Sequence, residues 1–242
     1  MTPPSKLLLV LEAIRSLFEY TQSILLSIPL QYMSPKGDGH PVVVLPGLGT
    51  ADGSTQYVRG FLTSLGYTVY PWGMGRNLGP RRGLDNLTAK IIENIQRISD
   101  ENGGAKVSLI GWSLGGIYAR EIAKAAPDLI RQVITLGTPF KGDHGATNVT
   151  MLYELLSKDR SHLDPTIIES VAKKPDVPFT SIYSKSDGVV SWQCCLEEIT
   201  PISENIEIPA ASHLGLGHNP ICLHIIANRL AQSATHWRPY NK

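Results

Sequence analysis

The sequence predicts an α/β fold, in which helices cover both faces of a mostly parallel central sheet. Short apolar runs, typical of buried strands, alternate along the chain with longer segments whose apolar residues recur at helical spacing. Turn-forming glycines and prolines follow most of the apolar runs. With 242 residues, the chain is long enough for one such domain with a sizeable hydrophobic core.

The composition is that of an ordinary globular protein. Hydrophobic residues make up 42% of the chain and charged residues 18%. The net charge is +1 and no basic run is interleaved with aromatics, so nothing favours a nucleic-acid partner. The three cysteines lack the spacing of a metal site. They allow one disulfide, from Cys194 or Cys195 to Cys222, or three free buried thiols.

The first element, residues 6–30, is predicted to be an amphipathic helix within an N-terminal extension at residues 1–34. Glu12, Arg15 and Glu19 interrupt its apolar run, which suits neither a secretion signal nor a membrane span. Its apolar residues recur at helical spacing; they are Leu7, Leu11, Ile14, Leu17 and Phe18. The helix either packs on the domain that follows or faces a lipid surface or the substrate channel.

The domain expected at residues 35–242 begins after a turn-rich boundary. Strands are predicted at residues 41–45, 67–70, 107–110, 132–136, 179–183 and 206–208. Helices are predicted at residues 54–65, 84–102, 117–126, 147–174 and from residue 220 onwards. This alternation is what favours a parallel sheet.

Local signals set the bounds of these elements. A valine-rich run marks the strand at residues 41–45, and Gly66 ends the helix that follows it. Pro127 ends the helix at residues 117–126. Asn219 can cap the last helix, with Pro220 at its first position.

The helical segment at residues 147–174 lies between two predicted strands, near the edge where ligands bind to such sheets. As an insertion at about residues 146–175, it would cover the site as a helical cap and supply an apolar wall for an acyl chain. A pair of crossover helices is the alternative interpretation.

The segment Gly111-Trp112-Ser113-Leu114-Gly115 joins a predicted strand to a predicted helix and matches the pattern G-x-S-x-G. A chain that turns from strand to helix within so few residues strains its corner residue, Ser113. Gly111 and Gly115 leave room where a Cβ would clash. The serine hydroxyl is therefore expected at the sheet edge, with the free N–H groups of the helix pointing toward it.

Two further residues complete a candidate triad. A serine hydroxyl is a poor nucleophile until a base takes its proton, and the base needs a third group to orient it. Asp187 follows the strand at residues 179–183, and His213 follows the last strand, so both fall where the site is expected. His218 in the same loop is the alternative base. The alternative acids are Asp143, Asp159, Asp164 and Asp176.

Backbone N–H groups are the expected donors to the oxyanion that forms when a serine attacks a carbonyl. The N–H of Leu114, directly after the serine, is one such donor. Leu48, in the loop after the strand at residues 41–45, is the second candidate. Gly47 and Gly49 flank Leu48 and let its backbone come close to the substrate.

Five motifs occur along residues 40–235; they are Pro46-Gly47-Leu48-Gly49, Gly111-Trp112-Ser113-Leu114-Gly115-Gly116, Leu136-Gly137-Thr138-Pro139-Phe140, Asp187-Gly188-Val189-Val190 and Ser212-His213-Leu214-Gly215. In residues and order they resemble the lipase and esterase branch of the α/β-hydrolase superfamily, as in bacterial serine lipases. The resemblance implies the α/β-hydrolase fold. The chain departs from it in two ways: Pro46 stands where many lipases have histidine, and a helix precedes the first strand.

We therefore expect a lipase or esterase that cleaves carboxylic esters of small molecules or lipids through an acyl-enzyme on Ser113. His213 is the expected base and Asp187 its orienter, with no metal and no organic cofactor. An acyltransferase with the same triad is the alternative. A non-catalytic ligand-binding protein on this fold is disfavoured because the triad is complete. The expected location is the cytoplasm, with peripheral membrane contact through residues 6–30 as an alternative.

Overall fold

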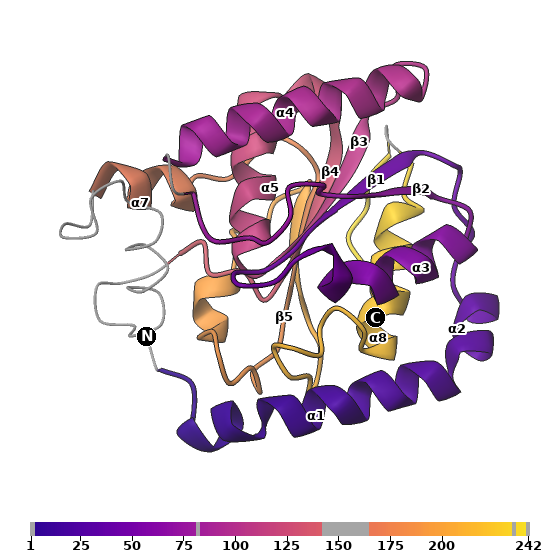
Figure 1. The fold of residues 1–242 in the computed structure, drawn as a ribbon, viewed down its shortest axis with the longest axis vertical. Coiled ribbons are helices and arrows are strands. Elements are labelled where there is room, and N and C mark those ends of the chain that lie inside the picture. Colours follow the sequence, from indigo (N-terminus) through magenta and orange to yellow (C-terminus); the bar gives the residue numbers. More distant parts are fainter. Residues whose placement is uncertain (1–2, 81–82, 142–164, 234–235, 241–242) are drawn as a thin grey trace.

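Six parallel strands form the central sheet in the part of the chain that the computed structural model describes, residues 3–80, 83–141, 165–233 and 236–240. Their order across the sheet is β2-β1-β3-β4-β5-β6 (Figure 1). Their bounds are β1 Pro41–Leu45, β2 Thr68–Pro71, β3 Val107–Trp112, β4 Ile130–Leu136, β5 Phe179–Tyr183 and β6 Ser203–Glu207. Because every neighbouring pair is parallel, the carboxyl ends of these strands lie at one edge of the sheet.

Helices cover both faces of this sheet, which confirms the predicted fold class. One face packs against α4, Leu84–Glu101, and α5, Leu114–Ala125. The other packs against α3, Gln56–Ser64, and α8, Pro220–Leu230. Within β1 the side chains alternate between the two cores, as the pleat of a strand requires. Short 3-10 turns, Asp52–Thr55, Pro127–Leu129 and Trp192–Cys195, complete the connections.

Two strands differ from their predicted bounds. β2 extends to Pro71, which is tolerated because β2 is the outermost strand on its side and needs no further donor there. β6 begins at Ser203 rather than residue 206, since its polar start is paired: Glu204 accepts hydrogen bonds from Thr180 and Arg229. The helix predicted at residues 147–174 lies mostly outside the described residues, which include α7, Pro165–Ala172.

The helix predicted at residues 6–30 is two helices, α1, Lys6–Leu25, and α2, Ser27–Met33. Leu26 separates them, with a φ of −95° and a ψ of 7° that leave the helical range. Pro29 stands in the first turn of α2, where a missing N–H is tolerated. The proline therefore marks the start of a second helix, a signal that the sequence interpretation overlooked.

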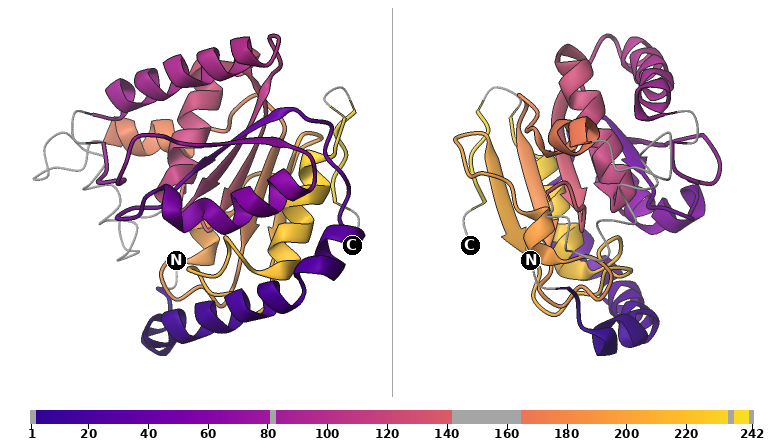
Figure 2. Two further views of the ribbon diagram at one scale, coloured as in Figure 1. Left: turned by 45° about the vertical axis from the view of Figure 1, so that its right-hand side comes forward. Right: turned by 90° about the vertical axis from the view of Figure 1, so that its left-hand side faces the viewer.

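Helix α1 crosses the carboxyl end of the sheet (Figures 1 and 2). Its glutamates accept hydrogen bonds from loops at that end, so its polar side faces the sheet. The side chains of Glu12 and Glu19 are buried, with exposed fractions of 3% and 5%, whereas Ile14, Leu17 and Phe18 are exposed. The helix thus packs on the domain, but through its polar residues. No helix in the described ranges is both long and apolar enough to span a membrane.

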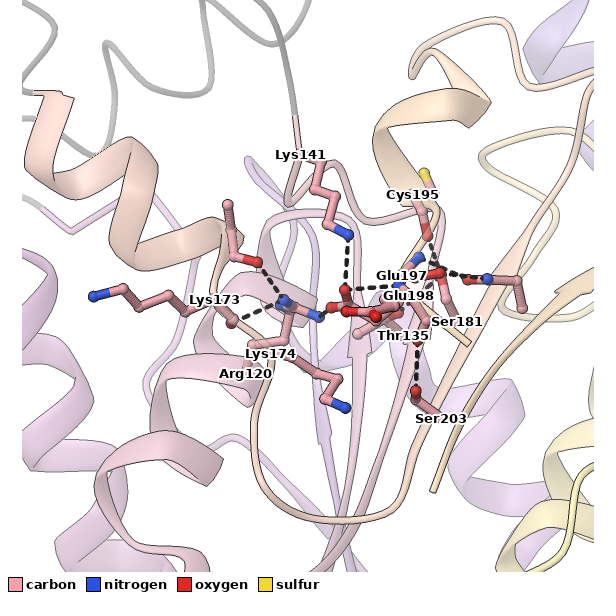
Figure 3. Close-up of polar contacts among 12 residues, drawn as sticks. Arg120, Thr135, Lys141, Lys173, Lys174, Ser181, Cys195, Glu197, Glu198 and Ser203 are labelled. Atoms are coloured by element: carbon pink, nitrogen blue, oxygen red, sulfur yellow. Dashed lines mark hydrogen bonds and ion pairs between the residues drawn. The ribbon is translucent and has the colours of Figure 1, made fainter. Parts of the chain in front are cut away.

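A buried ion pair stands on the α5 side of the sheet (Figure 3). The guanidinium of Arg120 lies 2.7 Å from the Glu197 carboxylate, and both side chains are buried. Lys141 contacts the same carboxylate at 2.8 Å, and Arg120 donates to the carbonyl of Lys173 at 3.0 Å. Lys141 lies shortly before the insertion predicted at about residues 146–175, and Lys173 lies near its end. The Arg120–Glu197 pair therefore contacts the chain close to both ends of that insertion.

Candidate active site

Ser113 is the corner residue between β3 and α5. Its φ of 52° lies in the left-handed region, which side-chain-bearing residues rarely adopt. Such a backbone conformation costs roughly 1–3 kcal/mol unless its surroundings hold it. Two hydrogen bonds do so: the Ser113 N–H donates to the carbonyl of Leu136 at 2.8 Å, and the Thr138 hydroxyl donates to the carbonyl of Ser113 at 3.0 Å.

Close backbone contacts explain the two glycines of the turn. A Cβ on Gly111 would overlap the backbone of Gly116, and a Cβ on Gly115 would overlap the backbone of Leu45. The first turn of α5 therefore rests directly on β1 and β3. This contact sets the position of the serine relative to the loop that follows β1.

Asp187 and His213 meet at the same edge of the sheet, from the loops after β5 and β6. Nδ1 of His213 lies 2.6 Å from Oδ2 of Asp187. The other carboxylate oxygen accepts the N–H groups of Val189 and Val190 at 2.8 and 2.7 Å. Both side chains are buried. Since an ionised carboxylate can only accept, the proton sits on Nδ1 and leaves Nε2 as the basic nitrogen.

The electrostatic surroundings of His213 favour its protonated form. Burial by itself lowers the pKa of this imidazole. The charge and hydrogen bond of Asp187, together with the charge of Glu12, outweigh burial and raise the pKa above its ordinary value of 6.5. The arrangement thus suits a group that must carry a positive charge transiently.

Ser113 and His213 open into one pocket, which we call the active-site pocket. Its volume is about 420 Å³, and its lining is mainly apolar; the lining residues are Leu9, Gly47, Leu48, Thr50, Trp112, Ser113, Pro139, Val189, Val190, His213 and Leu214. Within the described ranges, the Ser113 hydroxyl makes no hydrogen bond, so the serine–histidine bond is not formed in this structure. Such bonds are often long before substrate binds.

The loop that carries Leu48 lies beside the serine. A Cβ on Gly47 would lie 3.4 Å from the Cβ of Ser113, and Leu48 itself lines the active-site pocket. Leu114 begins α5, so its N–H belongs to the first turn, whose donors have no partner within the helix. The two predicted oxyanion donors therefore flank the serine.

Asn77 fastens the Leu48 loop, a role that sequence reasoning missed. Its side-chain amide donates to the carbonyl of Pro46 at 2.8 Å. Its backbone accepts from the N–H of Gly49 and donates to the carbonyl of Thr50, both at 2.7 Å. Asn77 is almost fully buried. The only sequence signal was an asparagine within a glycine-rich loop, which is too common to indicate such a role.

The alternative residues lie elsewhere or outside the described ranges. Nε2 of His218 lies 2.9 Å from the carbonyl of Ser16 on α1, so this histidine binds the helix and does not contact Asp187. Asp176 is exposed at the amino end of β5. The other alternative acids fall outside the described residues; they are Asp143, Asp159 and Asp164.

A second set of serine, histidine and aspartate stands at the opposite end of the sheet, and the sequence interpretation did not anticipate it. His40 contacts Asp38 through Nδ1 and the Ser108 hydroxyl through Nε2, the latter at 2.8 Å. Arg131 pairs with Asp38 at 2.8 Å. Ser108 has an exposed fraction of 0%, so no substrate reaches its hydroxyl. This set ties β1, β3 and β4 together at their amino ends.

The cysteines and other metal-binding side chains form no further centre in the parts of the chain that are described. All three cysteines are free thiols and buried. Across the described ranges, no three His, Cys, Asp or Glu side chains gather closely enough to hold a metal ion.

Comparison with known proteins connects this geometry to one family. The pattern of the Hydrolase_4 family, described as serine aminopeptidase S33, matches residues 39–191. Triacylglycerol lipases of Pseudarthrobacter phenanthrenivorans and Burkholderia plantarii are each 29% identical over 189 residues, 76% of this chain. The match covers 57% and 51% of those lipases, so the chain spans about half the length of the curated relatives it matches.

Solved structures share the fold at lower identity. Bacillus licheniformis lipase BlEst2 superposes with a TM-score of 0.60 at 15% identity, over 81% of this chain and 94% of that one. Aspergillus fumigatus lipase B gives a TM-score of 0.61 at 18% identity, over 84% of this chain and 57% of that one. These likenesses bear out the α/β-hydrolase fold.

Proposed function

The chain belongs to the Hydrolase_4 (serine aminopeptidase S33) family of α/β hydrolases, and from that premise we propose that it is a carboxylic ester hydrolase of the lipase or esterase type. The observation that carries the proposal is the convergence of Ser113, at its strained turn, and the His213–Asp187 pair on one apolar pocket. The sequence likeness to triacylglycerol lipases supports an ester as the substrate.

The proposed reaction runs through an acyl-enzyme. Nε2 of His213 takes the proton of the Ser113 hydroxyl as the oxygen attacks the ester carbon, and the N–H groups of Leu48 and Leu114 hold the oxyanion. The carbon–oxygen bond to the alcohol then breaks, and His213 gives its proton to the leaving alcohol. Water attacks the acyl group with His213 again as base, and Ser113 is released with the carboxylic acid.

The lining of the active-site pocket favours an acyl ester over a peptide bound by its free amino terminus. None of its described lining residues is an aspartate or a glutamate. A free α-amino group would therefore meet no counter-charge, whereas an acyl chain would contact leucine, valine, proline and tryptophan side chains. The same acyl-enzyme would serve an acyltransferase, which a competing alcohol acceptor would reveal.

The outer surface of α1 and α2 supports contact with a lipid surface as a second part of the proposal. Between residues 7 and 33, none of the exposed side chains is charged, and many are large and apolar. Leu9 and Leu214 are exposed and also line the active-site pocket, so this apolar surface continues into the pocket. A lipid ester would then pass from its own phase into the pocket without crossing water.

Hydrolysis of p-nitrophenyl esters of graded acyl length tests the function, with Ser113→Ala as the matched variant. We expect turnover by the native protein and a loss of at least about 10⁴-fold in the variant. His213→Ala should lose far more activity than His218→Ala. A fluorophosphonate probe that fails to label the folded native protein would contradict the proposal and favour a non-catalytic binding protein.

A further inference from the structure

Helix α1 reverses the usual arrangement of a surface helix. Its buried side chains are polar, Glu12, Glu19 and Ser23, while most of its large apolar side chains are exposed. Buried carboxylates are costly unless each oxygen finds a donor. Backbone N–H groups of the loops after β5 and β6 donate hydrogen bonds to Glu12 and Glu19, and they indicate the role of this helix.

The Glu12 carboxylate bridges the two loops of the candidate triad. One oxygen accepts the N–H of Gly188 at 2.8 Å, and the other accepts the N–H of Leu214 at 3.0 Å. Gly188 directly follows Asp187, and Leu214 directly follows His213. One side chain is therefore hydrogen-bonded next to both the acid and the base.

Neighbouring contacts hold the same two loops against α1. Arg15 donates to the carbonyls of Ser186 and Ala210 at 2.8 and 3.0 Å. Glu19 accepts the N–H of Ser212 at 2.8 Å. A Cβ on Gly188 would lie 2.5 Å from the carbonyl carbon of Leu8, so the loop of Asp187 lies directly on the helix backbone.

We propose that Glu12 is a positioning residue of the active site, which holds the loop of Asp187 and the loop of His213 at a fixed separation through one hydrogen bond to each. This inference rests on the proposed function, because it assumes that Asp187 and His213 act together. A glutamine could not replace Glu12 fully, since its amide NH₂ would face a backbone donor at one of the two loops.

The charge of Glu12 adds to its geometric role. It is one of two carboxylates whose charges favour the protonated imidazole of His213, the other being Asp187. Among the described residues, the other ionisable groups near the loops of the candidate triad are Arg15, which lies 3.6 Å from Glu12, and the side chains of Glu19, Cys195 and His218. Removing the Glu12 charge should therefore make His213 less basic.

The test compares Glu12→Gln with Glu12→Asp by steady-state kinetics across pH, on a soluble ester. Glu12→Gln should lower kcat by about tenfold to a hundredfold, because the triad loses its alignment. KM should stay within about twofold, since Glu12 does not line the active-site pocket. The acid limb of kcat/KM should move to lower pH. Glu12→Asp keeps the charge but shortens the reach, so it should lower kcat and leave the acid limb in place.

Glu204→Gln is the matched control for the loss of a buried carboxylate. Glu204 is also buried and multiply hydrogen-bonded, but it lies at the amino end of β6. This control should lose stability while keeping kcat and the acid limb of the native protein. Equal losses of kcat in Glu12→Gln and Glu204→Gln, with both acid limbs unmoved, would overturn the proposal.

A direct readout separates this inference from the proposed function. NMR titration of the His213 imidazole should give a lower pKa in Glu12→Gln than in the native protein, whether or not an ester is turned over. If Glu12→Gln does not fold, Glu12→Asp still decides: native kcat in that variant would overturn the proposal. Absent phosphonate labelling with a shifted His213 titration would refute the hydrolase function alone.

Discussion

Glu197 and Glu12 are both buried carboxylates, but their partners differ. Glu197 pairs with two cations, Arg120 and Lys141 (Figure 3). Although burial by itself raises the pKa of Glu197, these charges outweigh it and lower that pKa.

Glu12 takes its hydrogen bonds from backbone N–H groups beside the candidate triad, and the cation beside it, Arg15, lies 3.6 Å away. Both cations of Glu197 contact its carboxylate directly, whereas Arg15 stands farther from Glu12 and donates its hydrogen bonds to backbone carbonyls. The charge of Glu12 therefore still acts on His213.

The largest effect is expected from removal of Glu197, the carboxylate that is paired with cations. Glu197→Ala removes the carboxylate that contacts the guanidinium of Arg120, which is buried beside Phe140. We expect a loss of about 3–5 kcal/mol in the free energy of unfolding, with the acid limb of kcat/KM unmoved. Urea denaturation measures the first and a pH–rate profile the second. A large shift of the acid limb with little loss of stability would reverse the roles assigned to the two carboxylates.

The next prediction concerns Asn77, an uncharged side chain that holds a loop of the site, and so tests positioning without a charge. Asn77→Ala removes the amide that holds Pro46 and so loosens the loop of Leu48. We expect kcat to fall by about tenfold, less than the loss of an oxyanion donor itself, and the acid limb to stay in place because no charge is removed. Tyr118→Phe, which removes only the hydroxyl that donates to Asn77, is the milder control. Native kcat in Asn77→Ala would show that the loop holds itself.

A pH series on the native protein tests the raised pKa of His213. The proposed mechanism needs neutral His213, whose pKa is raised, so kcat/KM should rise with pH through a midpoint above 6.5. The stability that this raised pKa contributes is complete below 6.5 and is lost as pH rises through the folded-state pKa.

Two other histidines, His40 and His218, should change stability with pH in the opposite direction. Burial lowers the pKa of His40 despite the opposing contact with Asp38, and burial also lowers the pKa of His218. Their contribution to stability is present above 6.5 and is lost as pH falls through their folded-state pKa values. Urea unfolding at each pH measures the sum. An acid limb below 6.5 would contradict the raised pKa of His213.

The last prediction concerns membrane partition rather than catalysis or stability, and it tests the exposed side of α1. Leu17→Ser with Phe18→Ser should lower partition onto phospholipid vesicles by about tenfold or more, because both side chains would otherwise be buried in lipid. Turnover of a soluble ester should not change. Ile199→Ser is the matched control, since Ile199 is 74% exposed but precedes β6 at the far end of the sheet. Equal vesicle binding by all three proteins would exclude a lipid contact through α1.

The fold was predictable because its signals are local. The strand at residues 41–45 is β1 and the strand at residues 179–183 is β5, since each is a short apolar run bounded by breakers. The G-x-S-x-G motif likewise predicts a strand before it and a helix after it. The candidate acid and base could also be placed, because their loops follow strands in a fixed order.

Contacts between distant segments were beyond this reasoning. Helical spacing indicated that residues 6–30 have two unlike sides, but not that the polar side faces the sheet. Glu12, Arg15 and Glu19 interrupt an apolar run in the sequence, and their spacing equally fits a polar stripe along one side of a helix. Asn77 gave no signal either, because the carbonyl that it holds stands 31 residues earlier in the chain.

The bond between α1 and the triad loops has a consequence for synthesis. Glu12 lies 176 and 202 residues before its partners Gly188 and Leu214. On the ribosome, α1 therefore emerges long before the loops that will cover its two glutamates, and contacts of such separation form late in folding. Throughout that interval the apolar side of the nascent helix is available to a membrane or a chaperone. The loops of the candidate triad can be joined to Glu12 only after Leu214 has been translated.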